Sequence, residues 1–134
     1  MKITGLNHIT INVTDLEQSK AFYEKVLGLE PAGFIDMGDH ALTYYQLPQG
    51  VRLELIDYEQ KDQPVSVPET HVGMYRHLCL EVDSEASLKE LEERCAAFGR
   101  PVRKSSSWVE KLGCFNILIT DPNDVEIEVL SYNK

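Results

Sequence analysis

The 134-residue sequence predicts an α+β fold of two similar modules, each with the element order strand, helix, strand, strand, strand. The segments His8–Val13 and His77–Val82 both begin with a histidine and alternate polar with apolar residues, as half-buried strands do. Each segment is followed by a helix-like run that ends at a glycine, Gly28 or Gly99. This internal repeat predicts that the two halves fold alike.

In the first module, the alternation predicts a strand over 6–13. Thr14 with Glu17 three residues later has the pattern of a helix-capping box, so a helix is expected from there to Gly28. Turn-forming residues then separate three expected strands, at about 30–36, 41–47 and 51–57.

The segment 58–73 contains Pro64 and Pro68, lacks either periodicity and is expected to link the modules. The second module then repeats the order of the first, with these expected elements: strand 75–82, helix 85–98, a short strand 101–104, a loop over 105–111, and strands 113–120 and 125–131. We therefore expect a single domain over 1–134, with modules at about 1–58 and 74–134.

Composition and charge narrow the functional classes. The formal charge of −9 disfavours binding to nucleic acid, whose phosphates need a basic surface, and makes a small-molecule substrate the expected partner. The sequence lacks the roughly 18 consecutive apolar residues of a membrane helix. Three cysteines without CxxC spacing suggest reduced thiols and not a disulfide framework. We expect a cytoplasmic protein that does not associate with membranes.

Both modules carry one histidine and one glutamate on the strand face opposite the main aliphatic residues. These four residues are His8, Glu54, His77 and Glu128. A solvated face of an antiparallel sheet would also be polar, and for any one residue this is the simpler explanation. It explains less well why equivalent positions of a repeat carry the same pair of metal-ligand types.

The chain resembles the vicinal oxygen chelate superfamily, which includes glyoxalase I, methylmalonyl-CoA epimerase, fosfomycin-resistance enzymes, extradiol dioxygenases and bleomycin-resistance proteins. The resemblance covers essentially the whole chain and rests on the segments 8–16, 22–28, 53–55, 76–82 and 121–128. It implies a glyoxalase-like fold, in which two βαβββ modules form a curved mixed sheet cup. It also implies that His8, Glu54, His77 and Glu128 bind a divalent metal ion, while Glu126 matches a variable position.

Two imidazoles and two carboxylates suit a borderline ion such as Ni, Co, Mn, Fe or Zn. In the family such an ion stabilises an enediolate while a carboxylate moves a proton. The resemblance therefore implies a lyase or isomerase acting on a small 2-hydroxycarbonyl, 2-oxo or thioester compound, with Glu128 as the first candidate base and Glu54 as the second. Asn12 and Tyr58 differ from the residues that hold glutathione in bacterial glyoxalase I, so an enzyme resembling lactoylglutathione lyase need not use glutathione.

Two other functions stay open, an extradiol-type dioxygenase and a non-catalytic binding or resistance protein. The complete set of four ligands favours the lyase or isomerase. Candidate substrate-binding residues are Arg52, Tyr45 and Trp108, although Arg52 could instead form a salt bridge and both aromatic residues could belong to the core. Each half is small for an independent core, and family members pair modules within or between chains, so we expect a homodimer.

Overall fold

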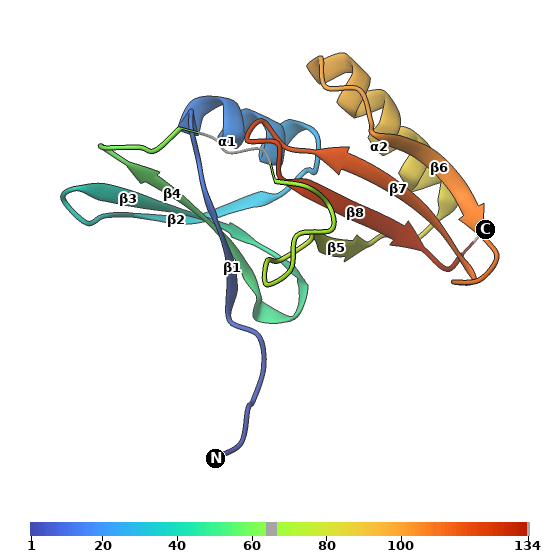
Figure 1. The fold of residues 1–134 in the computed structure, drawn as a ribbon, viewed down its shortest axis with the longest axis horizontal. Helices are drawn as coiled ribbons and strands as arrows, with labels where there is room; N and C mark the ends of the chain where they lie inside the picture. The colour runs from blue at the N-terminus through green and yellow to red at the C-terminus, as the bar shows by residue number, and fades with distance from the viewer. Residues whose placement is uncertain (64–66, 134) are drawn as a thin grey trace. The chain divides into compact units, whose positions relative to one another are not determined.

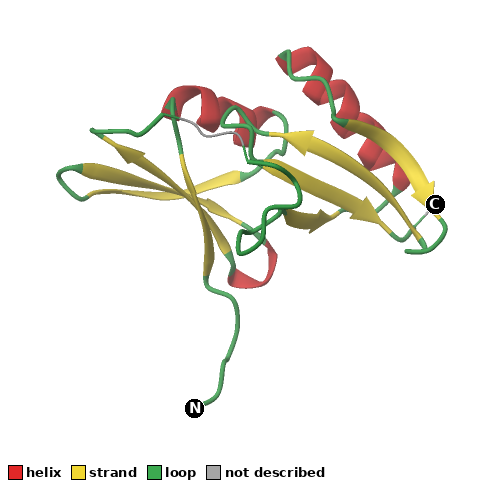
Figure 2. Cartoon of the chain, viewed as in Figure 1, coloured by secondary structure: helices red, strands yellow, loops and turns green. Residues whose placement is uncertain are grey.

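The computed structural model describes residues 1–63 and 67–133. The chain divides into two compact units, residues 1–64 and 65–134, whose boundary falls inside the predicted linker (Figure 1). Pro64 of that linker and the last residue, Lys134, lie outside the described residues. Each unit contains one α-helix and one four-stranded mixed sheet, as the sequence predicts (Figure 2).

The first unit has the order strand, helix, strand, strand, strand. Its elements are β1 (His8–Asn12), α1 (Leu16–Lys25), β2 (Glu30–Asp36), β3 (His40–Gln46), a short 3-10 turn (Pro48–Gly50) and β4 (Arg52–Tyr58). The strands are arranged β1-β4-β3-β2 across the sheet, with β1 parallel to β4 and the other neighbours antiparallel. The first and last strands of the unit are therefore neighbours.

The second unit repeats this topology. Its elements are β5 (Leu78–Glu81), α2 (Glu85–Phe98), β6 (Lys104–Val109), β7 (Cys114–Thr120) and β8 (Glu126–Ser131). The order across the sheet is β5-β8-β7-β6, and β5 is parallel to β8. The helix matches its predicted bounds, whereas β5 begins later than expected and leaves His77 immediately before the strand.

The cap of the first helix differs from the prediction. Asp15, and not Thr14, is the N-cap residue of α1, and its side chain accepts a hydrogen bond from the backbone N–H of Gln18 (3.1 Å). In α2 the side chain of Ser84 has this role, and Gly99 ends the helix with a left-handed backbone (φ 86°). Both helices thus begin at a side chain that accepts a hydrogen bond from a free backbone N–H.

The strand after the second helix is also different from the prediction. The sequence suggested a short strand at 101–104 and a loop over 105–111, but β6 covers 104–109. β6 is at the edge of its sheet and pairs only with β7, with an irregular register between Lys104 and Ser107. An edge strand with one neighbour tolerates polar residues such as Ser105, so its sequence resembles a loop.

Most of the buried apolar residues lie on the helix side of each sheet. In the second unit, Leu88, Leu91 and Cys95 of α2 are buried, as are the alternating aliphatic residues Ile117, Ile119, Ile127 and Val129 of β7 and β8. In the first unit, the most deeply buried apolar residues are Phe22, Tyr23, Val26, Tyr45, Leu53 and Leu55. The three cysteines are free, as expected. The opposite faces are left for polar side chains.

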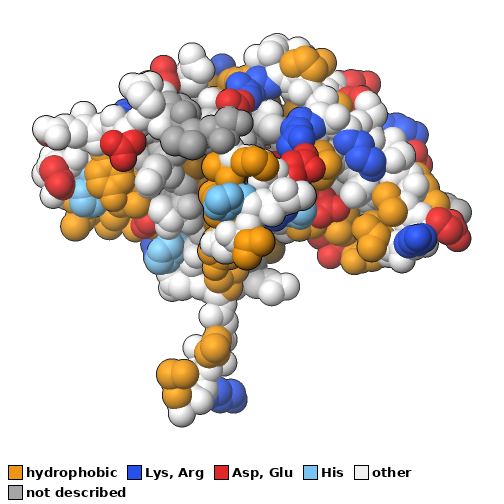
Figure 3. Space-filling model, viewed as in Figure 1, with side chains coloured by type: hydrophobic (Ala, Val, Ile, Leu, Met, Phe, Trp, Pro, Cys, Tyr) orange, Lys and Arg blue, Asp and Glu red, His pale blue; other side chains and the backbone are white. Residues whose placement is uncertain are grey.

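The first unit also leaves apolar groups exposed. Residues 1–7 precede β1 without regular structure, and Met1, Ile3 and Leu6 are exposed there (Figure 3). Every residue of the edge strand β2 is exposed, including Phe34 and Ile35. Within the described ranges, none of the helices is both long enough and apolar enough to cross a membrane.

Candidate functional site

In the first unit, parallel pairing of β1 and β4 places His8 beside Glu54. Thr10 is opposite Glu54 in the register, so His8 and Glu54 are on the same face of the sheet. The Nε2 atom of His8 lies 4.0 Å from Oε1 of Glu54. The Nδ1 atom of His8 is 2.7 Å from Oδ1 of Asn7, which suits a ring protonated at Nδ1 with a free lone pair at Nε2.

Glu54 is buried among polar groups. The hydroxyl of Thr10 donates a hydrogen bond to its Oε1 (2.9 Å), and the hydroxyl of Tyr44 also hydrogen-bonds to Glu54. Burial opposes ionisation of this carboxyl, but the hydrogen bonds from Tyr44 and Thr10, with the charges of His8 and Arg52, outweigh it and lower the pKa of Glu54. Glu54 is therefore a carboxylate at neutral pH.

Arg52 lies near this pair. It is directly opposite His8 in the register, and its guanidinium carbon is 4.4 Å from the centroid of the Tyr44 ring. Tyr44 is thus in contact with both Glu54 and Arg52 and belongs to the polar face.

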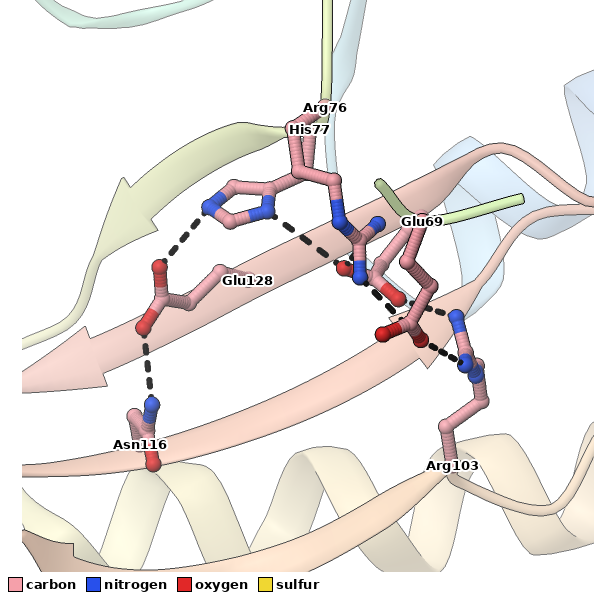
Figure 4. A network of polar contacts seen from close by, with 7 residues as sticks. Glu69, Arg76, His77, Arg103, Asn116 and Glu128 are labelled. Atoms are coloured by element: carbon pink, nitrogen blue, oxygen red, sulfur yellow. Dashed lines mark hydrogen bonds and ion pairs between the residues drawn. The ribbon is translucent and has the colours of Figure 1, made fainter. Parts of the chain in front are cut away.

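The second unit builds an equivalent pair with a shorter contact (Figure 4). The Nε2 atom of His77 lies 3.0 Å from Oε2 of Glu128, and Asn116 on β7 donates a hydrogen bond to Oε1 of Glu128 (2.7 Å). The hydrogen bond from Asn116 lowers the pKa of Glu128, burial opposes the shift, and the nearby His77 and Cys79 add to the lowering. Burial and the charge of Glu128 raise the pKa of the Cys79 thiol to about 11.

Next to His77, four charged side chains form a group of ion pairs that we call the charged cluster (Figure 4). Its members are Glu69, Arg76, Arg103 and Glu126. Arg76 Nη1 is 2.7 Å from Glu126 Oε1, and Arg103 forms a second ion pair with Glu126. Glu69 pairs with the same two arginines at 3.3 and 2.7 Å. Glu69 and Arg103 were not predicted from the sequence, because neither lies in a segment where polar and apolar residues recur with a clear period.

Two of the expected substrate-binding residues lie on the face of their sheet opposite the His–Glu pair. Tyr45 is fully buried on the helix side of its sheet, where its hydroxyl donates to Glu24 of α1 (2.9 Å). Trp108 pairs with Phe115 across β6 and β7, and its ring packs edge-on against Phe115, on the face opposite Asn116 and Glu128. Only Arg52 of the three shares a face with an expected metal ligand.

The donor atoms fit a divalent metal ion chemically. Each unit brings one imidazole nitrogen and one carboxylate oxygen together, and both carboxylates are held by side-chain hydrogen-bond donors. Within either unit, the described residues bring fewer than three potential ligands together at metal-binding geometry. Protein metal sites usually need about three or four ligands, so one pair alone would be half of a site.

Comparison with known proteins gives related sequences. Residues 5–129 match the sequence profile of the glyoxalase/bleomycin resistance protein/dioxygenase superfamily. Ethylmalonyl-CoA/methylmalonyl-CoA epimerase of Cereibacter sphaeroides is 32% identical over 74% of this chain and 79% of its own length. Mitochondrial methylmalonyl-CoA epimerase of Bos taurus is 30% identical over 72% of this chain, and the match spans only 63% of the bovine protein.

Solved structures give the same fold. A glyoxalase/bleomycin resistance protein/dioxygenase domain from Frankia sp. EAN1pec has a TM-score of 0.81 at 22% identity, covering 97% of this chain and 98% of that one. A variant of the fosfomycin resistance protein FosX from Listeria monocytogenes, complexed with Mn(II) and dihydroxypropylphosphonic acid, has a TM-score of 0.71 at 21% identity, covering 99% and 93%. The chain belongs to the glyoxalase/bleomycin resistance protein/dioxygenase superfamily.

Proposed function

We propose that the protein is a divalent-metal-dependent isomerase that removes and returns a proton at the carbon beside a carbonyl group. The observation that carries this proposal is the His–Glu pair on the polar face of each sheet, with contacts of 4.0 and 3.0 Å between nitrogen and oxygen. The relationship to methylmalonyl-CoA epimerases supports an isomerase over the other chemistries of the superfamily. The proposed substrate class is a small 2-substituted malonyl thioester.

We propose that the metal ion takes its protein ligands from both pairs, His8, Glu54, His77 and Glu128, within one chain or across a homodimer. A single pair offers only two donor atoms, whereas protein metal sites usually have about three or four protein ligands. When bound, the ion would stabilise the negative charge that develops on the carbonyl oxygen. Ni, Co, Mn, Fe and Zn all suit this donor set.

The chain's own carboxylates are the proposed proton carriers. Glu128 is ionised at neutral pH and is oriented by Asn116 and His77, so it can accept the proton. Glu54 is likewise ionised and oriented, and it is the second candidate. Two carboxylates on different strands suit an epimerisation, in which a proton is removed from one side of a carbon and returned on the other.

Arg52 is the proposed recognition residue for the free carboxylate of the substrate. Its guanidinium group stacks on Tyr44 and is half-buried on the face that carries Glu54. A planar guanidinium held in this way suits bidentate binding of a carboxylate. A malonyl thioester has such a carboxylate, whereas a simple 2-hydroxycarbonyl compound lacks one.

The proposal includes a cytoplasmic homodimer. Three free cysteines suit a reducing compartment, and the exposed apolar residues of the edge strand β2 suit a subunit contact. Sedimentation at micromolar concentration would measure the assembly state. Mixed dimers of His8→Ala and Glu128→Ala chains would recover activity only if ligands from two chains share a site.

The direct test is deuterium exchange from solvent into methylmalonyl-CoA, followed by mass spectrometry, with the protein reloaded with each of the five metals. We expect exchange together with conversion of a single epimer into a mixture of both C2 epimers. Parallel assays with the methylglyoxal–glutathione adduct, and of oxygen uptake with catechols, test the lyase and dioxygenase functions. Activity only in one of these two assays would replace the isomerase proposal.

A further inference from the structure

Glu126, on β8 of the second unit, is almost fully buried although it is a charged residue. Its side chain is 4% exposed, although it carries a carboxylate next to the polar face. Burying a charge is costly unless ion pairs and hydrogen bonds compensate for lost hydration. Two arginines, Arg76 and Arg103, provide this compensation. An ion pair at the protein surface would leave the carboxylate hydrated and would not carry this cost.

The buried carboxylate faces the expected metal ligand. Oε1 of Glu126 lies 3.4 Å from Nδ1 of His77, whereas Glu128 contacts Nε2, the other ring nitrogen. Both atoms are buried, and within the described residues neither makes a hydrogen bond of good geometry, although Oε1 is ion-paired with Arg76. The contact is long for a hydrogen bond, but Glu126 is the acceptor placed to receive a proton carried on Nδ1.

We propose that Glu126 is a positioning residue that holds His77 with its proton on Nδ1, so that Nε2 presents a lone pair for metal binding beside Glu128. This inference rests on the proposed metal-binding role of His77. A metal-bound imidazole usually donates its other N–H to a carboxylate, carbonyl or water, and this partner fixes the orientation of the ring. In the first unit, the exposed Asn7 occupies the corresponding place at His8.

The charged cluster gives Glu126 a fixed place. Arg76 directly precedes His77 in the chain, and Arg103 follows helix α2. Both guanidinium groups form ion pairs with the buried Glu126, and both also form ion pairs with the exposed Glu69. The cluster therefore has one carboxylate beside the imidazole, that of Glu126, and one at the surface, that of Glu69. Glu69 contacts the same arginines without an ion pair to His77 among the described residues, which makes it a matched control.

The test is Co²⁺ titration of metal-free wild type, Glu126→Gln and Glu69→Gln, with circular dichroism to verify folding. Loss of such an outer partner typically weakens metal binding about 10- to 100-fold, and we expect this for Glu126→Gln but not for Glu69→Gln. In a His77→Ala background, Glu126→Gln should cause little further loss, because its effect passes through His77. Equal cobalt affinity in wild type and folded Glu126→Gln would overturn the inference.

A second measurement needs no variant of Glu126. In the NMR spectrum of the Co²⁺-loaded wild type, the Nδ1–H protons of metal-bound histidines give strongly shifted, exchangeable signals. We expect a signal that disappears in His77→Ala to exchange slowly with solvent, since Nδ1 of His77 is buried against Glu126. A rapidly exchanging or missing His77 signal would overturn the inference.

The two proposals fail separately in these experiments. Cobalt binding that depends on Glu126, without deuterium exchange into any malonyl thioester, would refute only the isomerase function. Deuterium exchange with a cobalt affinity insensitive to Glu126→Gln would refute only the positioning role. A wild-type protein that binds no cobalt would overturn both.

Discussion

Tyr44 and Tyr45 are consecutive residues of β3 whose hydroxyls hydrogen-bond to carboxylates on opposite faces of the sheet. Tyr44 binds Glu54 on the polar face, and Tyr45 donates to Glu24 of the helix on the other face (2.9 Å). Burial and the Glu24 contact raise the pKa of Tyr45, while the Glu54 contact raises the pKa of Tyr44. Two identical side chains thus serve the core and the candidate site.

These tyrosines offer a paired test of the two faces. Tyr45→Phe should lower the free energy of unfolding by about 1 kcal/mol, because a buried hydrogen bond is lost, and should leave metal affinity unchanged. Tyr44→Phe should leave Glu54 with one hydroxyl donor fewer and raise its pKa. Chemical denaturation and carboxyl NMR titration of both variants measure these effects. A raised pKa of Glu54 in Tyr45→Phe, with a loss of stability in Tyr44→Phe, would show that each tyrosine lies on the other face of the sheet.

Glu128→Gln should separate metal binding from proton transfer. An amide oxygen can still bind a metal ion, but the amide cannot accept a proton at neutral pH. Loss of a general base costs about 10²- to 10⁴-fold in rate, so turnover should fall far more than metal affinity. Deuterium exchange and metal titration on the same sample give the two numbers. Unchanged exchange would move the base to Glu54.

Asn116→Ala should raise the pKa of Glu128, because the hydrogen bond from Asn116 is the largest cause of its lowering. A lowered folded-state pKa stabilises the fold above the unfolded-state value and loses this effect as the pH falls through the folded-state value. The variant should therefore lose stability at neutral pH and show a weaker dependence on acid between about pH 4.5 and the folded-state value.

Carboxyl NMR titration of the metal-free protein measures this change directly. Lys104→Gln is a suitable control, since Lys104 contacts Asn116, and of these two described residues it is Asn116 that donates a hydrogen bond to Glu128. A pKa of Glu128 that shifts equally in both variants would mean that the Asn116 hydrogen bond is not its cause.

Asp15→Ala should destabilise the fold by about 1 kcal/mol, because the helix loses the acceptor for the N–H of Gln18. Asp15→Asn should retain most of the stability, since an amide oxygen also caps a helix. Thermal or chemical denaturation compares the three proteins. Equal stability of the alanine and wild-type proteins would contradict the assigned cap.

The site pairs were predictable because the repeat and the strand alternation place each His and Glu on the less apolar face. The neighbouring aromatic residues were not predictable in the same way. The run Leu42–Tyr45 has no alternation of polar and apolar residues, so its faces become clear only from the pairing of Tyr44 with Glu54 in the register. From the sequence, Tyr45 was therefore expected to bind substrate, whereas Tyr44 is the residue on the polar face.

The charged cluster was hidden for another reason. Glu69 and Arg103 lie in irregular segments outside the strands and helices, and they meet Glu126 only through the tertiary fold. Local patterns carry no signal for such contacts. The edge strand β6 escaped prediction because its pairing with a single neighbour imposes little constraint on its residues.

The parallel pairing of the first and last strands in each unit also bears on how the protein folds. Thr10 and Glu54 hydrogen-bond although they are 44 positions apart in the sequence, so a long loop must close for this contact to form. Long-range pairings of this kind are slow to form, because the loop entropy is lost before the contact stabilises the chain. We therefore expect each His–Glu pair to form late in folding, so that partly folded chains lack an assembled ligand pair.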